Sequence, residues 1–171
     1  MAFKTAANAA LGIPGAYGLT PGVPDTAPGV AIGTIAKFYD DVQGEGEFIY
    51  LPGAANVAAG DIVIYDVLAG TVTRHSNATG TNSGRQVAFA IQALPANTYG
   101  WYQIEGLAIV SVVAGTVAGS MMGTATAGSV GNTADAGDQI LNARIVSAAG
   151  TPLANKAYAQ INRPFVQGQI T

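Results

Sequence analysis

Short runs of Val, Ile and aromatic residues, separated by glycine, asparagine and proline, make up most of the chain after Gly33. Each run has the length of one strand, and the residues between the runs favour turns. This spacing is typical of an antiparallel sandwich or small barrel. We therefore expect an all-β fold, a small antiparallel β-sandwich or barrel. The expected strands are 34–40, 47–51, 61–67, 71–76, 85–94, 100–106, 107–113, 139–148 and 157–165, and short helical turns are conceivable at 5–11 and 52–61.

The segment 99–117 contains Trp101, the only tryptophan of the chain. Alternation along a strand places Trp101 on one face and Tyr102 on the other, and a bend is expected at Glu105 and Gly106. The run that follows is apolar on both faces, which predicts burial on both sides. We interpret Trp101 as a core or interface aromatic in preference to a ligand-binding one.

Residues 1–33 differ in composition from the rest. They carry Pro14, Pro21, Pro24 and Pro28 among glycines, and proline favours extended backbone without hydrogen bonds. We predict an extended Pro/Gly-rich N-terminal arm at 1–33 and a β-domain at 34–171. The arm is either a disordered tail or a segment that orders on a partner. Four apolar residues of the arm, together with Trp101, are candidate contacts to a partner or to other subunits: Tyr17, Leu19, Val23, Val30 and Trp101.

Charged residues make up 10% of the chain, against about 25% in an average protein. Because so few charges cannot solvate a whole surface, we expect other copies of the protein to cover part of it, as a homo-oligomer. The uncharged segment 106–134 should be hidden between subunits. The net charge of −3 argues against nucleic-acid binding. Although Gly115, Gly119 and Gly123 have small-xxx-small spacing, abundant Thr and Ser and the lack of flanking Lys or Arg argue against a membrane span.

Few residues suggest catalysis or metal binding. His75 is the only histidine, its neighbour Ser76 should point to the opposite strand face, and we expect an exposed histidine at a strand end. The acidic turn with Asp40, Asp41, Glu45 and Glu47 could hold Ca²⁺, but a solvated turn is the favoured interpretation. Asp40 and Glu47 could face each other across a hairpin, yet no second feature supports an acid/base pair. We expect no enzyme activity, no cofactor and no metal.

Two short echoes occur along the chain. Ala-Gly-Asp occurs at 59–61 and 136–138, and Ala-Gly-Thr-Val at 69–72 and 114–117. Glycine can adopt positive φ and Asp can hydrogen-bond nearby backbone, so each echo can mark a turn before a strand. Shared turn chemistry explains the echoes more simply than a duplication.

The order of several motifs resembles a known family. AAGDIVIYD, VAFAIQAL, GWYQIEGLAIV, TAGSVG and a late INRP follow one another between residues 56 and 165. This order resembles the β-rich head decoration (cement) proteins of tailed bacteriophages. The resemblance implies a β-tulip-like fold and a structural protein without an active site. It also implies a homo-oligomer, most often a trimer. It would lie on the capsid exterior of the virion and brace neighbouring major capsid subunits.

Two other functions stay open. One is a head-fibre, tail or baseplate component. The other is a carbohydrate- or cell-surface-binding β-module, in which Trp101 with Tyr99 or Tyr102 would stack on a sugar ring.

Overall fold

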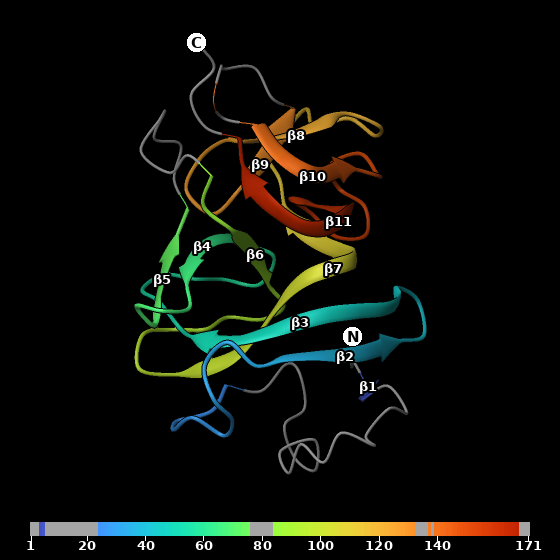
Figure 1. Ribbon diagram of the computed structural model, residues 1–171. Helices are drawn as coiled ribbons and strands as arrows, with labels where there is room; N and C mark the ends of the chain where they lie inside the picture. Colours follow the sequence, from blue (N-terminus) through green and yellow to red (C-terminus); the bar gives the residue numbers. More distant parts are fainter. Residues whose placement is uncertain (1–3, 6–23, 76–83, 133–136, 138, 168–171) are drawn as a thin grey trace.

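The computed structural model describes residues 4–5, 24–75, 84–132, 137 and 139–167. Within these residues the protein is all-β and contains no helix (Figure 1). The predicted all-β fold is confirmed, as a curled antiparallel sheet that forms a half-barrel. The strands are β1 (Lys4–Thr5), β2 (Ile35–Asp40), β3 (Gly44–Pro52), β4 (Ile62–Asp66), β5 (Thr71–Arg74), β6 (Val87–Ala90), β7 (Tyr99–Ser111), β8 (Met121–Thr124), β9 (Val130–Asn132), β10 (Gln139–Ile145) and β11 (Lys156–Val166).

Several strand predictions need correction. The expected strands 100–106 and 107–113 are one continuous strand, β7, because Gly106 takes a φ of 102° and bends the chain without ending the ladder. The sequence prediction missed β8 and β9, which lie in the uncharged segment 106–134. Residues 52–61 form two turns instead of a helical turn. The other possible helical turn, 5–11, lies mostly outside the described residues.

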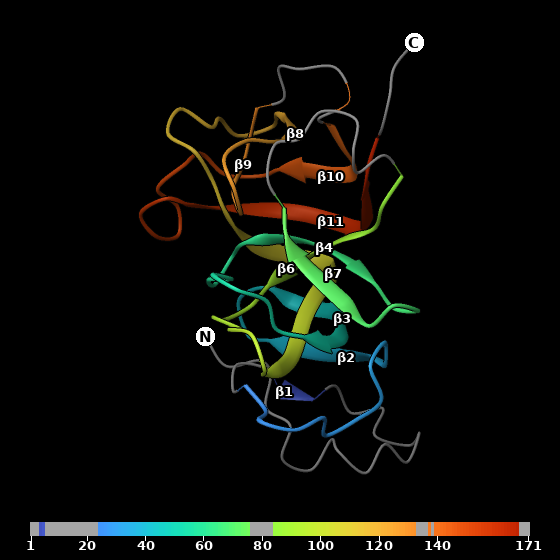
Figure 2. The ribbon, with the colours of Figure 1, turned by 90° about the vertical axis from the view of Figure 1, so that its left-hand side faces the viewer.

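The strand order is β1-β2-β3-β7-β11-β10-β8-β9, and β4, β5 and β6 branch from β7. β7 is the central element. Its first half pairs with β3 and its second half pairs with β11. In the view turned by 90°, β7 runs between the lower strands β2 and β3 and the upper strands β10 and β11 (Figure 2). The molecule is therefore two halves joined by one bent strand.

The two halves repeat the same strand pairing. In the first unit, β3 pairs with β7, β7 with β6, β6 with β4, and β4 with β5. In the second unit, β7 pairs with β11, β11 with β10, β10 with β8, and β8 with β9. Every one of these pairs is antiparallel. The chain thus contains two five-strand units in tandem that share β7.

The equivalence extends to the register of individual residues. Each of four residue pairs in the first unit has an equivalent pair in the second unit. Leu51↔Gly100 corresponds to Val110↔Ala157, and Ala90↔Tyr102 corresponds to Ile145↔Ala159. Ile62↔Phe89 corresponds to Met121↔Arg144, and Val63↔Arg74 corresponds to Met122↔Asn132. Gly106 within β7 and Arg163 within β11 occupy equivalent positions, and both have positive φ. The sequence echoes do not fall on equivalent residues of the two units, so the structural repeat does not account for them. Shared turn chemistry remains their simpler explanation.

A recurring four-residue turn connects the strands. In each, Ala occupies the second position, Gly or Asn with positive φ occupies the third, and the fourth N–H donates to the first carbonyl, as in type II turns. The turns are 54–57, 58–61, 95–98, 113–116, 126–129, 148–151 and 153–156. The expected turn before β4 is confirmed at 58–61. Its expected counterpart at 136–138 lies largely outside the described residues.

Apolar side chains form three clusters. The largest lies mainly in the second unit and includes Val110, Met122 and Ile161. A second, with Leu51 and Tyr102, lies inside the first unit. The third consists of Phe38, Phe48, Tyr50 and Trp101. Trp101 and Tyr102 therefore pack in different clusters, as their alternation predicts.

The second half of β7 differs from its prediction. Ala108 and Val110 are buried, but Leu107 and Ile109 on the other face are only partly buried. The expectation of burial on both sides is therefore wrong for this half. The uncharged segment 106–134 contributes Val112, Met122 and Val130 to the protein's own core, where they pack within one chain.

Candidate functional site

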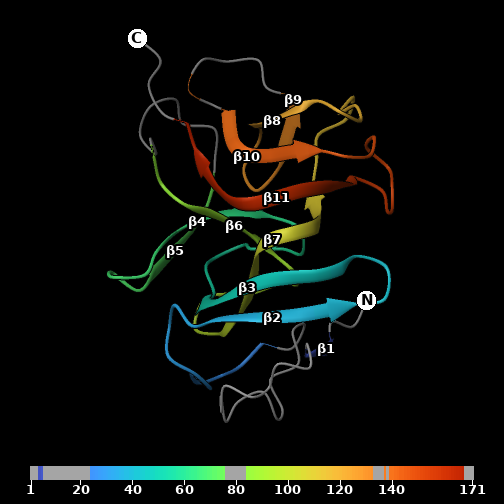
Figure 3. The same cartoon turned by 45° about the vertical axis from the view of Figure 1, so that its right-hand side comes forward.

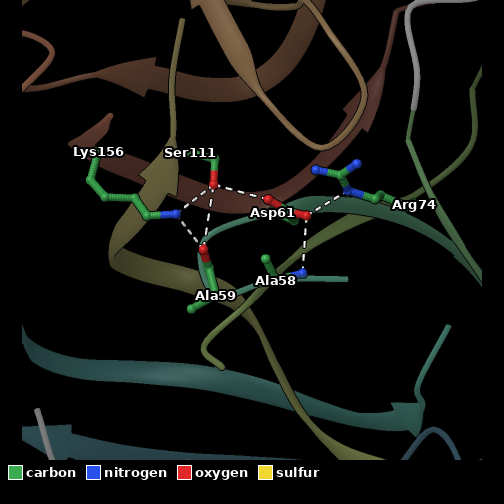
Figure 4. Close-up of polar contacts among 6 residues, drawn as sticks. All are labelled: Ala58, Ala59, Asp61, Arg74, Ser111 and Lys156. Atoms are coloured by element: carbon green, nitrogen blue, oxygen red, sulfur yellow. Dashed lines mark hydrogen bonds and ion pairs between the residues drawn. The ribbon is translucent and has the colours of Figure 1, made fainter. Parts of the chain in front are cut away.

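The most connected cluster of buried polar groups is centred on Asp61, which closes the turn 58–61 just before β4 (Figure 4). Asp61 is 2% exposed. Its Oδ2 accepts hydrogen bonds from the Ala58 N–H at 3.0 Å and from Arg74 Nε at 2.6 Å. The expected bond from this Asp to nearby backbone is thus confirmed, and the ion pair with Arg74 offsets the cost of burying the carboxylate.

Ser111 and Lys156 connect this cluster to the second unit. They face each other in the register of β7 and β11. Ser111 Oγ donates to Asp61 Oδ1 at 3.0 Å, and Lys156 Nζ donates to Ser111 Oγ at 2.7 Å and to the Ala59 carbonyl. Burial lowers the pKa of Lys156, and the negative charge of Asp61 partly opposes this shift. Four segments that are distant in sequence therefore meet in one hydrogen-bonded network.

A serine hydroxyl beside a lysine amine is the arrangement of a nucleophile and its base. Acyl transfer also needs free N–H donors for the developing oxyanion. Here the N–H of Ser111 donates to the Gly60 carbonyl at 2.7 Å, and the N–H of Val112 donates to the Asn155 carbonyl at 3.0 Å. Ser111 is also buried. The geometry therefore favours a structural cross-link between the two units.

An uncharged version of part of this cluster occurs in the second unit. Ser120 and Asn132 occupy the positions equivalent to Asp61 and Arg74. Ser120 Oγ lies 2.8 Å from Asn132 Oδ1, which also accepts the N–H of Val117 at 3.1 Å. In both units a polar pair holds the preceding turn against the hairpin that follows it.

Sequence reasoning identified the turn of Asp61 but missed Arg74, Ser111 and Lys156 as its partners. Their separations along the chain are set by the strand pairing, and no local pattern marks them.

His75 does not fit its prediction as an exposed strand-end histidine, because it is 3% exposed. Its backbone N–H donates to the Ile62 carbonyl, and its carbonyl accepts from the Gly128 N–H, so the segment around Gly128 lies beside it. Burial lowers the pKa of His75 to about 4. At neutral pH His75 is therefore an uncharged part of the interior. Ser76 lies outside the described residues.

The acidic turn between β2 and β3 uses its side chains within the chain. Asp40 Oδ1 accepts the N–H groups of Val42 and Gln43, and Asp40 is buried instead of solvated. Glu45 pairs with Lys37 at 2.9 Å and Glu47 with Arg163 at 2.5 Å. Asp40 lies opposite Gly44, so it does not face Glu47 across the hairpin. Among the described residues no group of three or more acidic or histidine side chains could hold a metal ion.

Trp101 belongs to the aromatic cluster and is 4% exposed. Its ring packs edge-on against Phe38 at 5.0 Å and Tyr50 at 5.2 Å between centroids. Phe38 also packs edge-on against Phe48. This burial fits the core interpretation of Trp101, and it leaves the ring little surface for a partner.

The last residues of the arm are fastened beside this aromatic cluster. The backbones of Asp25 and Tyr99 exchange two hydrogen bonds, of 2.8 and 2.9 Å. Tyr50 donates its hydroxyl proton to Asp25 Oδ2 at 2.5 Å and accepts the N–H of Gly29 at 3.1 Å. Val30 packs against the cluster. Residues 24–33 thus contact the β-domain directly, while Tyr17, Leu19 and Val23 lie outside the described residues.

Burial, strengthened by the hydrogen bond to Asp25, raises the pKa of Tyr50 to about 12. The hydroxyl therefore keeps its proton and remains a donor at physiological pH.

Several large apolar side chains stay exposed, among them Val42, Leu68, Val117, Met121 and Leu153. The part of the chain that the structure describes has no helix long and apolar enough to cross a membrane. Comparison of the chain with protein families, with curated proteins and with solved structures gave no match.

Proposed function

We propose that the protein is a structural component of a tailed-phage virion that decorates the capsid exterior and stabilises it by binding across neighbouring major capsid subunits. In this proposal the β-domain is a rigid body, and residues 1–23 carry contacts to the shell or to neighbouring copies. The protein acts as a homo-oligomer, with the trimer implied by the family resemblance, and has no catalytic role.

The observation that carries the proposal is the anchored root of the arm. Asp25 is held through its backbone by Tyr99 and through its side chain by Tyr50. A segment that starts from a fixed point has fewer conformations to lose when its apolar residues bind a partner. Tyr17, Leu19 and Val23 precede this anchor, and each apolar side chain contributes about 1–3 kcal/mol when fully buried.

The polar groups support the same proposal. The Asp61 network, the Asp40 turn and the Glu47–Arg163 pair all join parts of the chain to each other. Such networks stabilise a scaffold, and the low content of charge suits a protein whose surface is largely covered in an assembly.

A head-fibre, tail or baseplate role would use the same features, and the location of the protein on the particle separates it from decoration. The sugar-binding alternative is weaker, because stacking on a sugar needs an exposed ring face and Trp101 is buried among Phe38 and Tyr50.

The test is binding to capsids that lack the protein. Purified protein should co-sediment with such capsids, and cryo-electron microscopy should show its density outside the capsid lattice. A version without residues 1–23 should fold and fail to co-sediment. Density confined to the tail, or full occupancy without residues 1–23, would contradict the proposal.

A further inference from the structure

Two loops lie side by side at the far end of the second unit. Residues 113–120 precede β8, and residues 146–155 connect β10 to β11 (Figure 3). The Ala149 N–H donates to the Thr116 carbonyl at 2.9 Å, and the Gly119 N–H donates to the Ile145 carbonyl at 2.9 Å. Neither loop contains an ionisable side chain. We call residues 113–120 and 146–155 the uncharged end.

The uncharged end exposes apolar side chains. Val117 is 53% exposed and Leu153 is 59% exposed, and Val146 is also exposed. The smaller exposed apolar residues are Ala114, Ala118, Ala148 and Ala154. Met121, at the start of β8, adds a further exposed side chain beside this surface.

The first unit shows what covers the equivalent surface. The turn 58–61 of the first unit is equivalent to 117–120 of the second unit. Residues of the second unit contact the turn 58–61. The Ser111 N–H donates to the Gly60 carbonyl, and Lys156 Nζ donates to the Ala59 carbonyl. This contact leaves Gly60 buried, whereas its equivalent in the second unit, Gly119, is exposed. Ala59 and its equivalent Ala118 are exposed in both units. In the described part of the chain no third unit lies against them.

Repeat units stack because each unit buries a face of its neighbour, and an end unit without a polar cap leaves such a face open. We propose that the uncharged end is a self-association surface and that a second copy of this chain covers it.

Charge does not oppose a second copy as the occupant. Two molecules with a net charge of −3 repel each other, and contact through a surface without ionisable groups avoids placing like charges together. No charged group at the uncharged end has to lose water when it is covered. This inference builds on the proposed structural role and adds the surface through which copies of the protein meet.

The experiment measures mass by light scattering coupled to size exclusion at micromolar concentration. The full chain should elute as a multiple of 17.1 kDa. Val117→Asp with Leu153→Asp should reduce the mass to that of the monomer. Leu68→Asp is the matched control, because Leu68 is 99% exposed on the β4–β5 hairpin of the first unit. This control should keep the mass of the unmodified protein.

Three results would overturn the inference. They are a monomeric unmodified protein, an unchanged mass in the double variant, and equal dissociation by Leu68→Asp. Circular dichroism and thermal melting establish that the variants fold. Val117→Arg is a second, milder variant, expected to weaken association at least tenfold.

The outcome is distinct from that of the capsid test. An unmodified protein that associates through the uncharged end but does not bind capsids would contradict the decoration role and leave this inference intact. A monomeric protein that decorates capsids would contradict this inference and leave the decoration role intact.

Discussion

The hydroxyl of Tyr50 lies 2.5 Å from the Asp25 carboxylate and so joins β3 to the root of the N-terminal arm. Tyr50 also packs against Trp101 and Tyr99, which fixes the direction of its ring. A rigid donor opposite a carboxylate makes a strong hydrogen bond, because one partner is charged and the other has little freedom to lose. The aromatic cluster therefore fixes the position at which the arm joins the β-domain.

Tyr50→Phe should destabilise the protein by about 2 kcal/mol, since hydrogen bonds to charged groups contribute about 1.5–3 kcal/mol. The loss should appear as a lower urea midpoint with an unchanged slope. Tyr102→Phe is the control. The hydroxyl of Tyr102 donates to the uncharged Pro52 carbonyl at 3.2 Å, so this variant should lose only about 1 kcal/mol. Equal losses in the two variants would show that the Asp25 contact has no special strength.

Two truncations separate the anchor from the rest of the arm. Deleting residues 1–23 removes the two-residue edge strand β1 from its pairing with β2. It should still leave the melting temperature within a few degrees, because Asp25 and Val30 continue to cover the aromatic cluster. Deleting residues 1–33 removes these contacts as well and should lower the melting temperature by at least about 5 °C. Thermal melting by circular dichroism compares the two. A similar melting temperature in both truncations would mean that 24–33 contribute nothing to stability.

The strands were largely predictable, because alternation and turn residues are local features. The recurring turn explains much of this success, since Ala-Gly or Ala-Asn marks the connection itself. β8 and β9 were missed because they are short and contain Gly123 and Gly131, which resemble a loop. The division of β7 was wrong because Gly106 bends a strand that its partners continue to hold.

The polar cluster and the repeat could not be predicted in this way. Asp61, Ser111 and Lys156 meet only because β7 pairs with β11 and the turn 58–61 packs against both. The two units share their hydrogen-bond register and not their residue types. Tyr50↔Trp101, for example, is equivalent to Ile109↔Tyr158. His75 was misplaced for a related reason, because the segment that covers it comes from Gly128.

The buried His75 should make stability depend on pH. Its folded pKa of about 4 lies below the ordinary histidine pKa of 6.5, so the unfolded chain binds more protons between these values. The contribution of His75 to the free energy of unfolding should be fully present above pH 6.5 and should decrease as the pH falls towards 4. At about 1.4 kcal/mol per pH unit the loss of unfolding free energy is at most about 3.5 kcal/mol. Urea denaturation at several pH values measures it, and His75→Gln should give a smaller slope in this window. An equal slope in that variant would assign the effect to other groups.

The Ser111 hydroxyl should contribute more to stability than that of Ser120. Ser111→Ala removes contacts with two charged groups, Asp61 and Lys156, and leaves them less well satisfied in a buried site. We expect a loss of about 2 kcal/mol. Ser120→Ala removes only bonds to the uncharged Val117 carbonyl and Asn132 and should lose about 1 kcal/mol. Urea denaturation compares the two, and a larger loss in Ser120→Ala would show that the Asp61 network is not the stronger cross-link.

Gly128 should tolerate a side chain less well than Gly115, although both lie in similar turns. Their φ angles are 77° and 82°, so a Cβ atom costs a similar backbone strain at either position, about 1 kcal/mol. At Gly115 the added Cβ would meet no atom within 4 Å, whereas at Gly128 it would lie 2.5 Å from Arg74 Nε. The same Nε donates to Asp61, so Gly128→Ala has to displace the ion pair that closes the buried cluster. We expect Gly128→Ala to lose at least about 1 kcal/mol more than Gly115→Ala in urea denaturation, because the displaced carboxylate remains buried. Equal losses would mean that Arg74 moves aside freely and that its contact with Asp61 adds little to the stability of the fold.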